Sequence, residues 1–476
     1  MFIGRGEYFE MLGALWGRDT GVLVTCRGRR RIGKSTLIEE FAARTADRFI
    51  SIDGLPPRPG LDDDAQRRHF CEKVAEHANR AYVRAETWSQ AFAQLDGILA
   101  GGGRTVVLLD EISWMGGSNP DFAGYLKEAW DRKLRKHADL VFVLCGSVSS
   151  WIAENILDST GFVGRNSLDL EVGELPLRDC VRMFGESGGR LSEGEIFDIL
   201  SLTGGVPKYL EEIRPEISVD ENVRKTCFLP QGLLFREFDE TFSSVFGRKV
   251  KSRGMILRRL ADGAQSLSEL SRSAGTESHG GFTKALRDLQ LAGFIKAAKG
   301  LNPETGRPLR QERYRIRDNY ARFYLKFVEP RKQAIADGLF RFASLEQLHG
   351  WETVLGLQFE NLVLNHVGDL LPLLGLDHSL VLSAAPYVQR PTTAGEGCQV
   401  DLLIQTQRTA FVVEIKRRDR IGHEVIDEVA RKVARLRRRK ALSVRTALVY
   451  AGELAKSVPA DRYFDFIIPA GRLLGR

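Results

Sequence analysis

Paired cysteines are missing from this 476-residue chain, whose six cysteines are scattered and form no C-x-x-C pair. Several lie in apolar stretches, which favours reduced, buried thiols in a cytosolic protein over disulfides. The eight histidines show no zinc-like spacing. No apolar run is long enough to span a bilayer, and residues 1–7 lack the hydrophobic region of a signal peptide. We therefore expect a cytoplasmic protein with no membrane partner.

Internal repeats and long low-complexity tracts are also absent. A chain of 476 residues is expected to contain about three domains. Its 69 lysines and arginines outnumber 62 aspartates and glutamates, which gives a net charge of +7. This mild excess favours a polyanionic partner such as nucleic acid.

The most informative segment is residues 28–35, Gly-Arg-Arg-Arg-Ile-Gly-Lys-Ser, which fits the phosphate-binding pattern G-x-x-x-x-G-K-[ST]. An apolar strand is expected at 22–26 before it and a helix at 36–41 after it. In that context, backbone N–H groups and Lys34 contact the β- and γ-phosphates of ATP, and the Ser35 hydroxyl is placed to ligate Mg²⁺. The residues expected to bind the nucleotide here are Gly28, Arg29, Arg30, Arg31, Ile32, Gly33, Lys34, Ser35 and Thr36.

Two carboxylates complete the expected ATPase site. The apolar run 105–109 ends in Asp110 and Glu111, and burying such charges is costly unless a cation or a water uses them. Asp110 is the expected Mg²⁺ partner, and Glu111 the base that orients the attacking water. The apolar run 140–145 leads to Ser147, which we expect at the same edge, sensing the γ-phosphate. The pattern predicts ATP hydrolysis.

The order of these segments predicts an α/β fold. Strands expected at 22–26, 48–52, 105–109, 140–145 and 168–172 alternate with helical stretches, which indicates a parallel sheet flanked by helices. We assign residues 1–173 to the P-loop ATPase core and residues 174–245, helical and polar, to a helical lid on the nucleotide.

Arg165 stands between the fourth strand and this lid. Three interpretations stay open: it contacts the γ-phosphate of its own chain, it reaches a neighbour's site as an arginine finger, or it is a surface arginine. The second would require a homo-oligomer.

Residues 246–330 have the pattern of a winged helix-turn-helix. Helices are expected near 249–260, from a capping box at 266–269, and at 282–289, and segments 294–296 and 312–317 are expected to pair as a hairpin. DNA is favoured over RNA as the partner, with a lid or a protein contact as the alternative. The cationic residues expected to face phosphates are Lys284, Arg287, Lys296, Arg307, Arg310 and Arg313.

Residues 331–476 hold a second candidate site. Strands are expected at 400–404 and 410–416, and alternation puts Glu414 and Lys416 on one face, to which Asp401 on the paired strand can point. Glu360, in an amphipathic helix, is a further acidic ligand. Carboxylates in this arrangement bind Mg²⁺, and a lysine beside them positions a water or stabilises charge. The alternative is a degenerate domain whose charges form salt bridges.

A strongly basic helix is expected at 431–440, directly after this site. Its charge would suit a nucleic-acid backbone.

Together these residues resemble the archaeal-type P-loop ATPase family, a STAND/AAA+-related group, over nearly the whole chain. The residues that carry the resemblance are Phe2-Ile3-Gly4-Arg5, 28–35, Leu109-Asp110-Glu111, 204–207, 314–324, 397–404 and 413–416. The resemblance implies that Phe2-Ile3-Gly4-Arg5 pack around the adenine, with Gly4 and Arg5 among the nucleotide-binding residues, and that 204–209 form a sensor region of the lid. It also implies that the last domain is a small α/β, restriction-endonuclease-like PD-(D/E)XK domain. The sequence departs from many relatives in having no aromatic and arginine pair before Asp401.

Two functions follow from the sequence. In one, ATP binding and hydrolysis control a DNA-associated, metal-dependent nuclease, as would suit defence against foreign DNA or a mobile element. In the other, the chain is an ATP-dependent switch that binds DNA or protein through the winged helix, with an inert C-terminal domain. The intact Asp401, Glu414, Lys416 and Glu360 favour the first.

Overall fold

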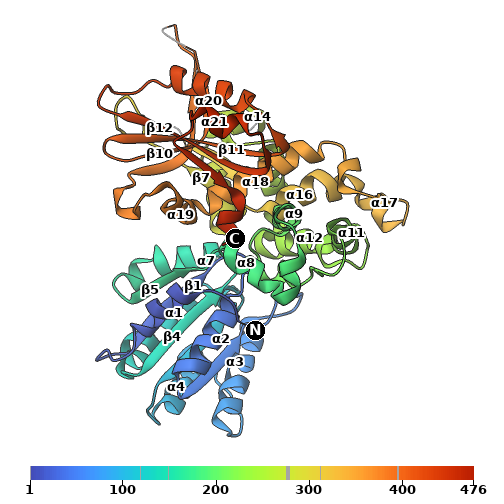
Figure 1. The fold of residues 1–476 in the computed structure, drawn as a ribbon. Helices are drawn as coiled ribbons and strands as arrows, with labels where there is room; N and C mark the ends of the chain where they lie inside the picture. The colour runs from blue at the N-terminus through green and yellow to red at the C-terminus, as the bar shows by residue number, and fades with distance from the viewer. Residues whose placement is uncertain are drawn as a thin grey trace. The chain divides into compact units, whose positions relative to one another are not determined.

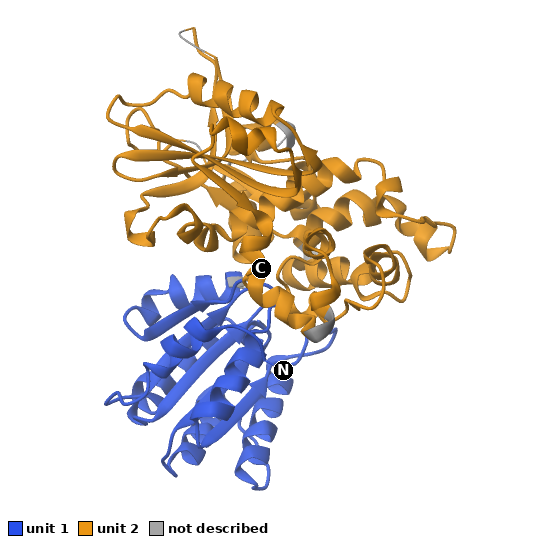
Figure 2. Cartoon of the chain, viewed as in Figure 1, with its two compact units in different colours: residues 1–173 blue, residues 174–476 orange. Residues whose placement is uncertain are grey.

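The computed structural model describes residues 2–117, 119–147, 149–274, 279–310, 312–393 and 396–475. The chain divides into two compact units, residues 1–173 and 174–476 (Figure 2). Each unit has its own five-stranded sheet, and the second also contains a small three-stranded one.

The first unit is built on a parallel sheet with the strand order β2-β3-β4-β1-β5 (Figure 1). All five strands predicted for this region are present, and the central ones are buried along their length, as their apolar sequences require. The strands are β1 Val22–Arg27, β2 Arg48–Asp53, β3 Thr105–Asp110, β4 Leu140–Gly146 and β5 Asn166–Glu171.

Helices flank this sheet, and two begin at side-chain caps that the sequence supplies. Asp62 accepts a hydrogen bond from the backbone N–H of Ala65, and Thr87 accepts one from Gln90. Such caps satisfy N–H groups that have no partner within the helix. The helices are α1 Gly6–Gly13, α2 Lys34–Thr45, α3 Asp63–Ala78, α4 Trp88–Leu99, α5 Ile112–Met115, α6 Phe122–Arg132 and α7 Ser149–Ile152.

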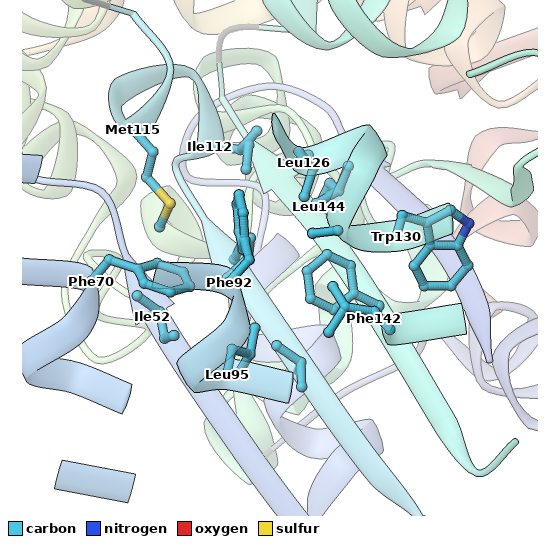
Figure 3. Close-up of a cluster of buried hydrophobic side chains, with 14 of the residues drawn as sticks. Ile52, Phe70, Phe92, Leu95, Ile112, Met115, Leu126, Trp130, Phe142 and Leu144 are labelled. Carbon is cyan, nitrogen blue, oxygen red and sulfur yellow. The ribbon is translucent and has the colours of Figure 1, made fainter. Parts of the chain in front are cut away.

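A buried core of the first unit contains several aromatic side chains among aliphatic ones. Figure 3 shows Phe70 and Phe92 between the helices and the sheet, with Phe142 and Trp130 on the other side of the cluster. The Phe70 and Phe92 rings meet edge to face with centroids 5.3 Å apart. Each such side chain contributes about 1.5–3 kcal/mol by leaving water, so this core fixes the sheet that carries the phosphate-binding loop.

The second unit begins with a helical region, as predicted for residues 174–245. Helix α9 of this region starts at a full capping box, in which Ser192 and Glu195 each accept a backbone N–H of the other. The helices are α8 Leu177–Met183, α9 Glu193–Thr203, α10 Pro207–Leu210, α11 Val219–Cys227 and α12 Leu233–Phe246.

Three helices and a small antiparallel sheet follow, and we call residues 250–316 the winged-helix region. The predicted capping box forms: Ser266 N donates to Glu269 at 2.7 Å and Glu269 N donates to Ser266 Oγ at 3.3 Å. In the predicted hairpin, Ile295 pairs with Ile316. The elements are α13 Val250–Leu260, β6 Gln265–Ser266, α14 Leu267–Ala274, α15 His279–Leu291, β7 Ile295–Ala298 and β8 Arg313–Ile316.

The remainder of the second unit is a mixed sheet with the strand order β13-β12-β11-β10-β9, in which β9, β10 and β11 are antiparallel and β11, β12 and β13 are parallel. Both strands predicted around 400–416 are present. The elements are α16 Asn319–Phe323, α17 Lys332–Ala336, α18 Trp351–Asn365, α19 Val367–Leu370, β9 Ser383–Gln389, β10 Cys398–Gln405, β11 Thr409–Ile421, α20 Glu424–Arg435, β12 Ser443–Leu454, α21 Ser457–Asp461 and β13 Phe466–Pro469.

The basic helix predicted at 431–440 is wrong in its second half. Helix α20 ends at Arg435, and Leu436 is extended, with φ −64° and ψ 108°. The backbone N–H of Arg437 then donates to Gln389 Oε1 of β9 at 2.9 Å. A tertiary contact therefore ends the helix where its charge pattern alone would continue it.

No helix in the described part of the chain is long and apolar enough to cross a membrane.

Candidate functional site

The phosphate-binding loop joins β1 to α2 at the carboxyl edge of the first sheet. Gly33, at φ 85°, takes a conformation that side chains disfavour. Gly28 lies so close to the end of β5 that an added Cβ would be 2.4 Å from the Val172 carbonyl oxygen. These two positions explain why the loop needs glycine at both ends of its pattern.

Lys34 lies folded back on this loop. Its Nζ donates to the carbonyl oxygens of Gly28 at 3.1 Å and Arg29 at 3.0 Å. The ammonium is buried, at 7% exposure, and these carbonyls satisfy it. A triphosphate in the loop offers stronger, charged acceptors for the same ammonium.

Ser35 and Asp110 come together although they lie 75 residues apart, because the Ser35 hydroxyl donates to Asp110 Oδ2. Strand β4 lies between β1 and β3, so the contact crosses the edge of one intervening strand. A hydroxyl and a carboxylate in contact form the oxygen donor set that Mg²⁺ prefers. The two residues therefore fit the cation expected here.

Glu111 is fixed by Ser147. It has the left-handed φ of 46°, which is uncommon for a residue other than glycine. Its Oε2 accepts the backbone N–H of Ser147 at 3.2 Å, and both carboxylate oxygens lie 2.9 Å from Ser147 Oγ. Strained backbone of this kind is characteristic of functional positions.

Two more carboxylates lie near Asp110, and sequence reasoning missed them. Asp53 is the register partner of Asp110 at the ends of β2 and β3, and Glu39 lies on α2. Burial raises the pKa of both groups, and the Asp110 charge raises each further. An aspartate directly after the predicted strand 48–52 was the available signal for Asp53.

Arg5 braces the loop. Its Nη2 donates to the Ile32 carbonyl at 3.0 Å and its Nη1 to the Gly173 carbonyl at 2.7 Å. Arg5 and the neighbouring Gly4 have left-handed φ values of 68° and 70°. The role of these two residues around adenine, which the resemblance implies, stays a prediction. In the structure, Arg5 forms a hydrogen bond directly with the backbone of the loop.

The contact of Arg165 with the γ-phosphate of its own chain is contradicted by the structure. Arg165 precedes Asn166, which pairs with Leu23 near the amino end of β1, whereas the phosphate-binding loop follows the carboxyl end. The guanidinium forms a bidentate ion pair with Asp131, in which Nε lies 2.6 Å from Oδ1 and Nη2 lies 3.0 Å from Oδ2. The order of segments in the sequence predicted that Arg165 follows the fourth strand. It did not show that Arg165 lies at the edge of the sheet opposite to the phosphate-binding loop.

The second site lies on β10 and β11. The Nζ of Lys416 is 2.8 Å from Glu414 Oε1, and the Ile415 N–H donates to Asp401 Oδ2 at 3.0 Å. Glu414 is fully buried. Burial, together with the Glu414 charge, raises the pKa of Asp401 to about 6. Asp401, Glu414 and Lys416 therefore meet at one point, as the alternation of side chains along the two strands predicts.

Two residues of α20 complete this cluster and were not predicted as members. Lys432 Nζ contacts Glu414 and lies 3.5 Å from Asp401 Oδ1, while Glu428 accepts from Lys416 at 2.7 Å. Glu428 and Lys432 are four residues apart and so share one helical face, which was the available signal. An ammonium thus lies against both carboxylates that the sequence predicts as metal ligands.

Glu360 lies near this cluster on α18. Burial, then the Asp401 charge, raise its pKa to about 7. Within the described ranges no three or more His, Cys, Asp or Glu side chains form a group that could hold a metal ion. The predicted metal set of Glu360, Asp401 and Glu414 is therefore not preassembled. Asp401 and Glu414 alone still offer the oxygen donors that a hard cation takes.

The predicted cationic face of the winged-helix region is divided. Lys284 and Arg287 on α15 and Lys296, Arg307 and Arg310 around the hairpin are exposed. Arg313 instead turns inward, 3.4 Å from Glu269 Oε2.

The hairpin loop of this region also docks on the mixed sheet. Gln405 Nε2 donates to the Leu301 carbonyl at 2.7 Å, and Arg439 N donates to that of Pro303 at 3.1 Å. The winged-helix region and the sheet with Asp401 are thus held together inside the second unit.

Comparisons with known proteins give distant similarities. The sequence matches no protein-family model. It is 22% identical over 423 residues, 88% of each chain, to an uncharacterised protein of Methanocaldococcus jannaschii. Among solved structures, it is similar to the Walker-type ATPase of Pyrococcus abyssi, with a TM-score of 0.46, 18% identity, and coverage of 68% of this chain and 96% of the other.

Two further similarities are to the ORC2 protein of Aeropyrum pernix and a RuvB mutant of Thermotoga maritima. For ORC2, solved with ADPNP and ADP, the TM-score is 0.42 with 13% identity over 70% of this chain and 93% of the other. For RuvB the TM-score is 0.34 with 16% identity over 65% and 92%.

Proposed function

We propose that the first unit binds and hydrolyses ATP with Mg²⁺, and that its nucleotide state controls a metal-dependent, nuclease-like site in the second unit that acts on DNA. One observation carries the ATPase part. Lys34, the Ser35–Asp110 pair and the Glu111–Ser147 pair all lie at the carboxyl edge of one parallel sheet. Ligands of open parallel sheets bind at this edge.

Each of these residues has a defined task in hydrolysis. Lys34 exchanges the carbonyls of Gly28 and Arg29 for phosphate oxygens, which neutralises charge on the transferred group. Ser35 and Asp110 would hold Mg²⁺, which supplies charge stabilisation at the phosphates. Both oxygens of Glu111 accept hydrogen bonds from Ser147, which positions the side chain to orient a water and take its proton.

A Lys34→Ala variant tests nucleotide binding at this loop. Loss of the ammonium removes the charged contact to the phosphates, and we expect ATP affinity to fall at least about 100-fold. Lys133→Ala, an exposed lysine after α6, is the matched control. Binding of a fluorescent ATP analogue measures both. Equal affinity in the two variants would refute the loop as the nucleotide site.

The nuclease-like part is supported by the cluster at Asp401, Glu414 and Lys416. Asp401 and Glu414 would hold Mg²⁺ or Mn²⁺, which polarises a phosphodiester. Lys416, though burial disfavours its charge, has its pKa raised by Glu414 and Glu428 and stays cationic beside the attacked phosphate. For a metal ion to bind, Lys432 must leave the two carboxylates.

Lys432 also supports the second candidate function, an ATP-dependent switch that binds DNA or protein with an inert C-terminal domain. Its ammonium lies against Asp401 and Glu414, as in a site neutralised by salt bridges. Titration of Mn²⁺ into the wild type and a Lys432→Met variant separates the two. A nuclease site binds Mn²⁺ in the wild type and more tightly in the variant; an inert site binds in neither.

Arg165 as a finger in a neighbouring subunit remains part of the proposal. It requires the Asp131 ion pair to open and a homo-oligomer to form. Arg165→Ala would then lower ATP turnover only at concentrations where subunits associate.

A further inference from the structure

A pocket beside Glu360 is lined by residues of the winged-helix region, α16, α18, β9 and β10. Its cavity is about 270 Å³. Residues from five separate elements meet here although the chain between them spans more than a hundred positions. The lining residues used below are Arg313, Arg315, Arg322, Glu360, Val388 and Gln399.

Arg315, on β8, is buried in this wall at 5% exposure, and no described carboxylate forms an ion pair with it. Its Nη1 donates to Asn361 Oδ1 and its Nη2 donates to Asn365 Oδ1 at 2.7 Å. Amide oxygens satisfy hydrogen bonds but do not neutralise a guanidinium. Burial, and repulsion from Arg322 and Arg317, lower the pKa of Arg315 to about 9.

Arg322, on α16, is in the same situation at 3% exposure. Its Nη1 donates to the Leu357 carbonyl at 3.1 Å and to Gln358 Oε1 at 2.8 Å, whereas its Nε has no hydrogen-bond partner in the described residues. A buried donor without an acceptor costs about 1–3 kcal/mol, more when it is charged.

The acidic groups around the pocket leave part of this charge uncompensated. Glu360 and Asp318 act on Arg322 only at longer range, since no ion pair within 4 Å joins either buried arginine to a carboxylate in the described ranges. Asp262, at the rim, pairs with Lys326, and Arg313 pairs with Glu269.

We propose that this pocket binds a phosphate group between Arg315 and Arg322, from either a nucleic-acid backbone or a free phosphate-bearing molecule. Guanidinium groups match phosphate in geometry and charge, and burial strengthens the contact. Because the pocket joins β8 of the winged-helix region to the α18 helix that carries Glu360, a bound phosphate links DNA binding to the nuclease-like site. The proposal does not require cleavage.

Val388 offers a test that leaves the arginines in place. It lies on β9, partly exposed, and lines the pocket. Val388→Glu adds a carboxylate to the lining of the pocket that contains the two guanidinium groups, and it should compete with phosphate. Val388→Gln is the neutral control of the same size. Both variants keep the phosphate-binding loop of the first unit intact, so phosphate bound there contributes equally to both.

Calorimetric titration of the full-length variants with inorganic phosphate and with a short single-stranded deoxyoligonucleotide gives the answer. We expect at least a ~10-fold weaker affinity in Val388→Glu than in Val388→Gln, and a higher melting temperature because the new carboxylate neutralises the arginines. An effect on phosphate alone indicates a free ligand, and an effect on the oligonucleotide indicates the backbone. Equal affinities of the two variants for both ligands would overturn the proposal.

If Val388→Glu fails to fold, Gln399→Glu replaces it. Gln399 is exposed at the same rim, and the change preserves its shape. Gln407→Glu, exposed in the β10–β11 turn, adds the same charge outside the pocket. Weaker phosphate binding in Gln399→Glu alone supports the site, and the same binding in both contradicts it.

Discussion

At the scale of single residues, the chemistry of the two candidate sites depends on the group that each charged side chain contacts. Lys34 rests on carbonyls, Glu111 on Ser147, and Glu414 on two lysines. Each contact is one that a substrate or a cation can replace. The chemistry therefore depends on exchange of partners, and single substitutions that remove one partner have separable effects.

Glu111→Gln is expected to trap bound ATP. The amide keeps the size of the side chain but cannot take a proton, so we expect kcat to fall about 10²–10⁴-fold with ATP affinity maintained. Single-turnover hydrolysis with quantification of retained ATP measures this. Turnover at the wild-type rate in the variant would remove Glu111 from its assigned role.

Glu360 should make the stability of the second unit depend on pH. Its pKa of about 7 lies above the unfolded value, so the folded state holds the proton more tightly. The contribution of the Glu360 carboxyl group to the stability of the folded state is therefore fully present below about pH 4 and is lost as the pH rises through 7. Asp401, with its pKa near 6, adds a fall in the same direction.

We therefore expect Glu360→Gln to flatten the decrease in melting temperature between pH 5 and pH 7.5. Glu346→Gln, an exposed glutamate before α18, is the control and should keep the wild-type profile. Thermal melts across this range measure the difference. Identical profiles for the two variants would mean that Glu360 titrates normally.

At the scale of elements, local sequence patterns predicted most of the strands and helices. They did not predict contacts between residues that lie far apart in the sequence. The apolar runs gave all five strands of the first sheet, and residues 266–269 gave a capping box that forms. Periodicity does not show, however, that Gln389 captures Arg437 and ends α20, nor that Lys432 turns toward Glu414. Both depend on residues brought close only by the folded sheet.

Helix α15 is the element expected to carry DNA affinity, because the neighbouring hairpin loop is docked on the mixed sheet. Replacing its exposed Lys284 and Arg287 by alanine should weaken DNA binding and lower the salt slope by up to about 0.9 per lost phosphate contact. Arg18→Ala, exposed in the first unit, is the control. DNA affinities measured from about 50 to 200 mM salt test this prediction. If the dependence of affinity on salt is the same in the variant as in the wild type, the winged-helix region is a protein contact instead.

At the scale of the whole molecule, the candidate ATP site and the candidate nuclease-like site belong to different compact units. Substitutions in one should therefore leave the basal chemistry of the other intact, and only their coupling should be lost. The sequence places these two sites in separate segments, but the hydrogen bonds at the first site and the ion pairs at the second are known only from the folded structure.

The central claim is that nucleotide in the first unit controls cleavage in the second. Plasmid and linear DNA incubated with Mg²⁺ or Mn²⁺, with and without ATP, test it in the wild type, Asp401→Ala and Lys34→Ala. We predict cleavage by the wild type at an ATP-dependent rate, none by Asp401→Ala despite normal ATP turnover, and ATP-independent behaviour of Lys34→Ala. A wild type that cuts no nucleic acid with either metal would contradict the claim.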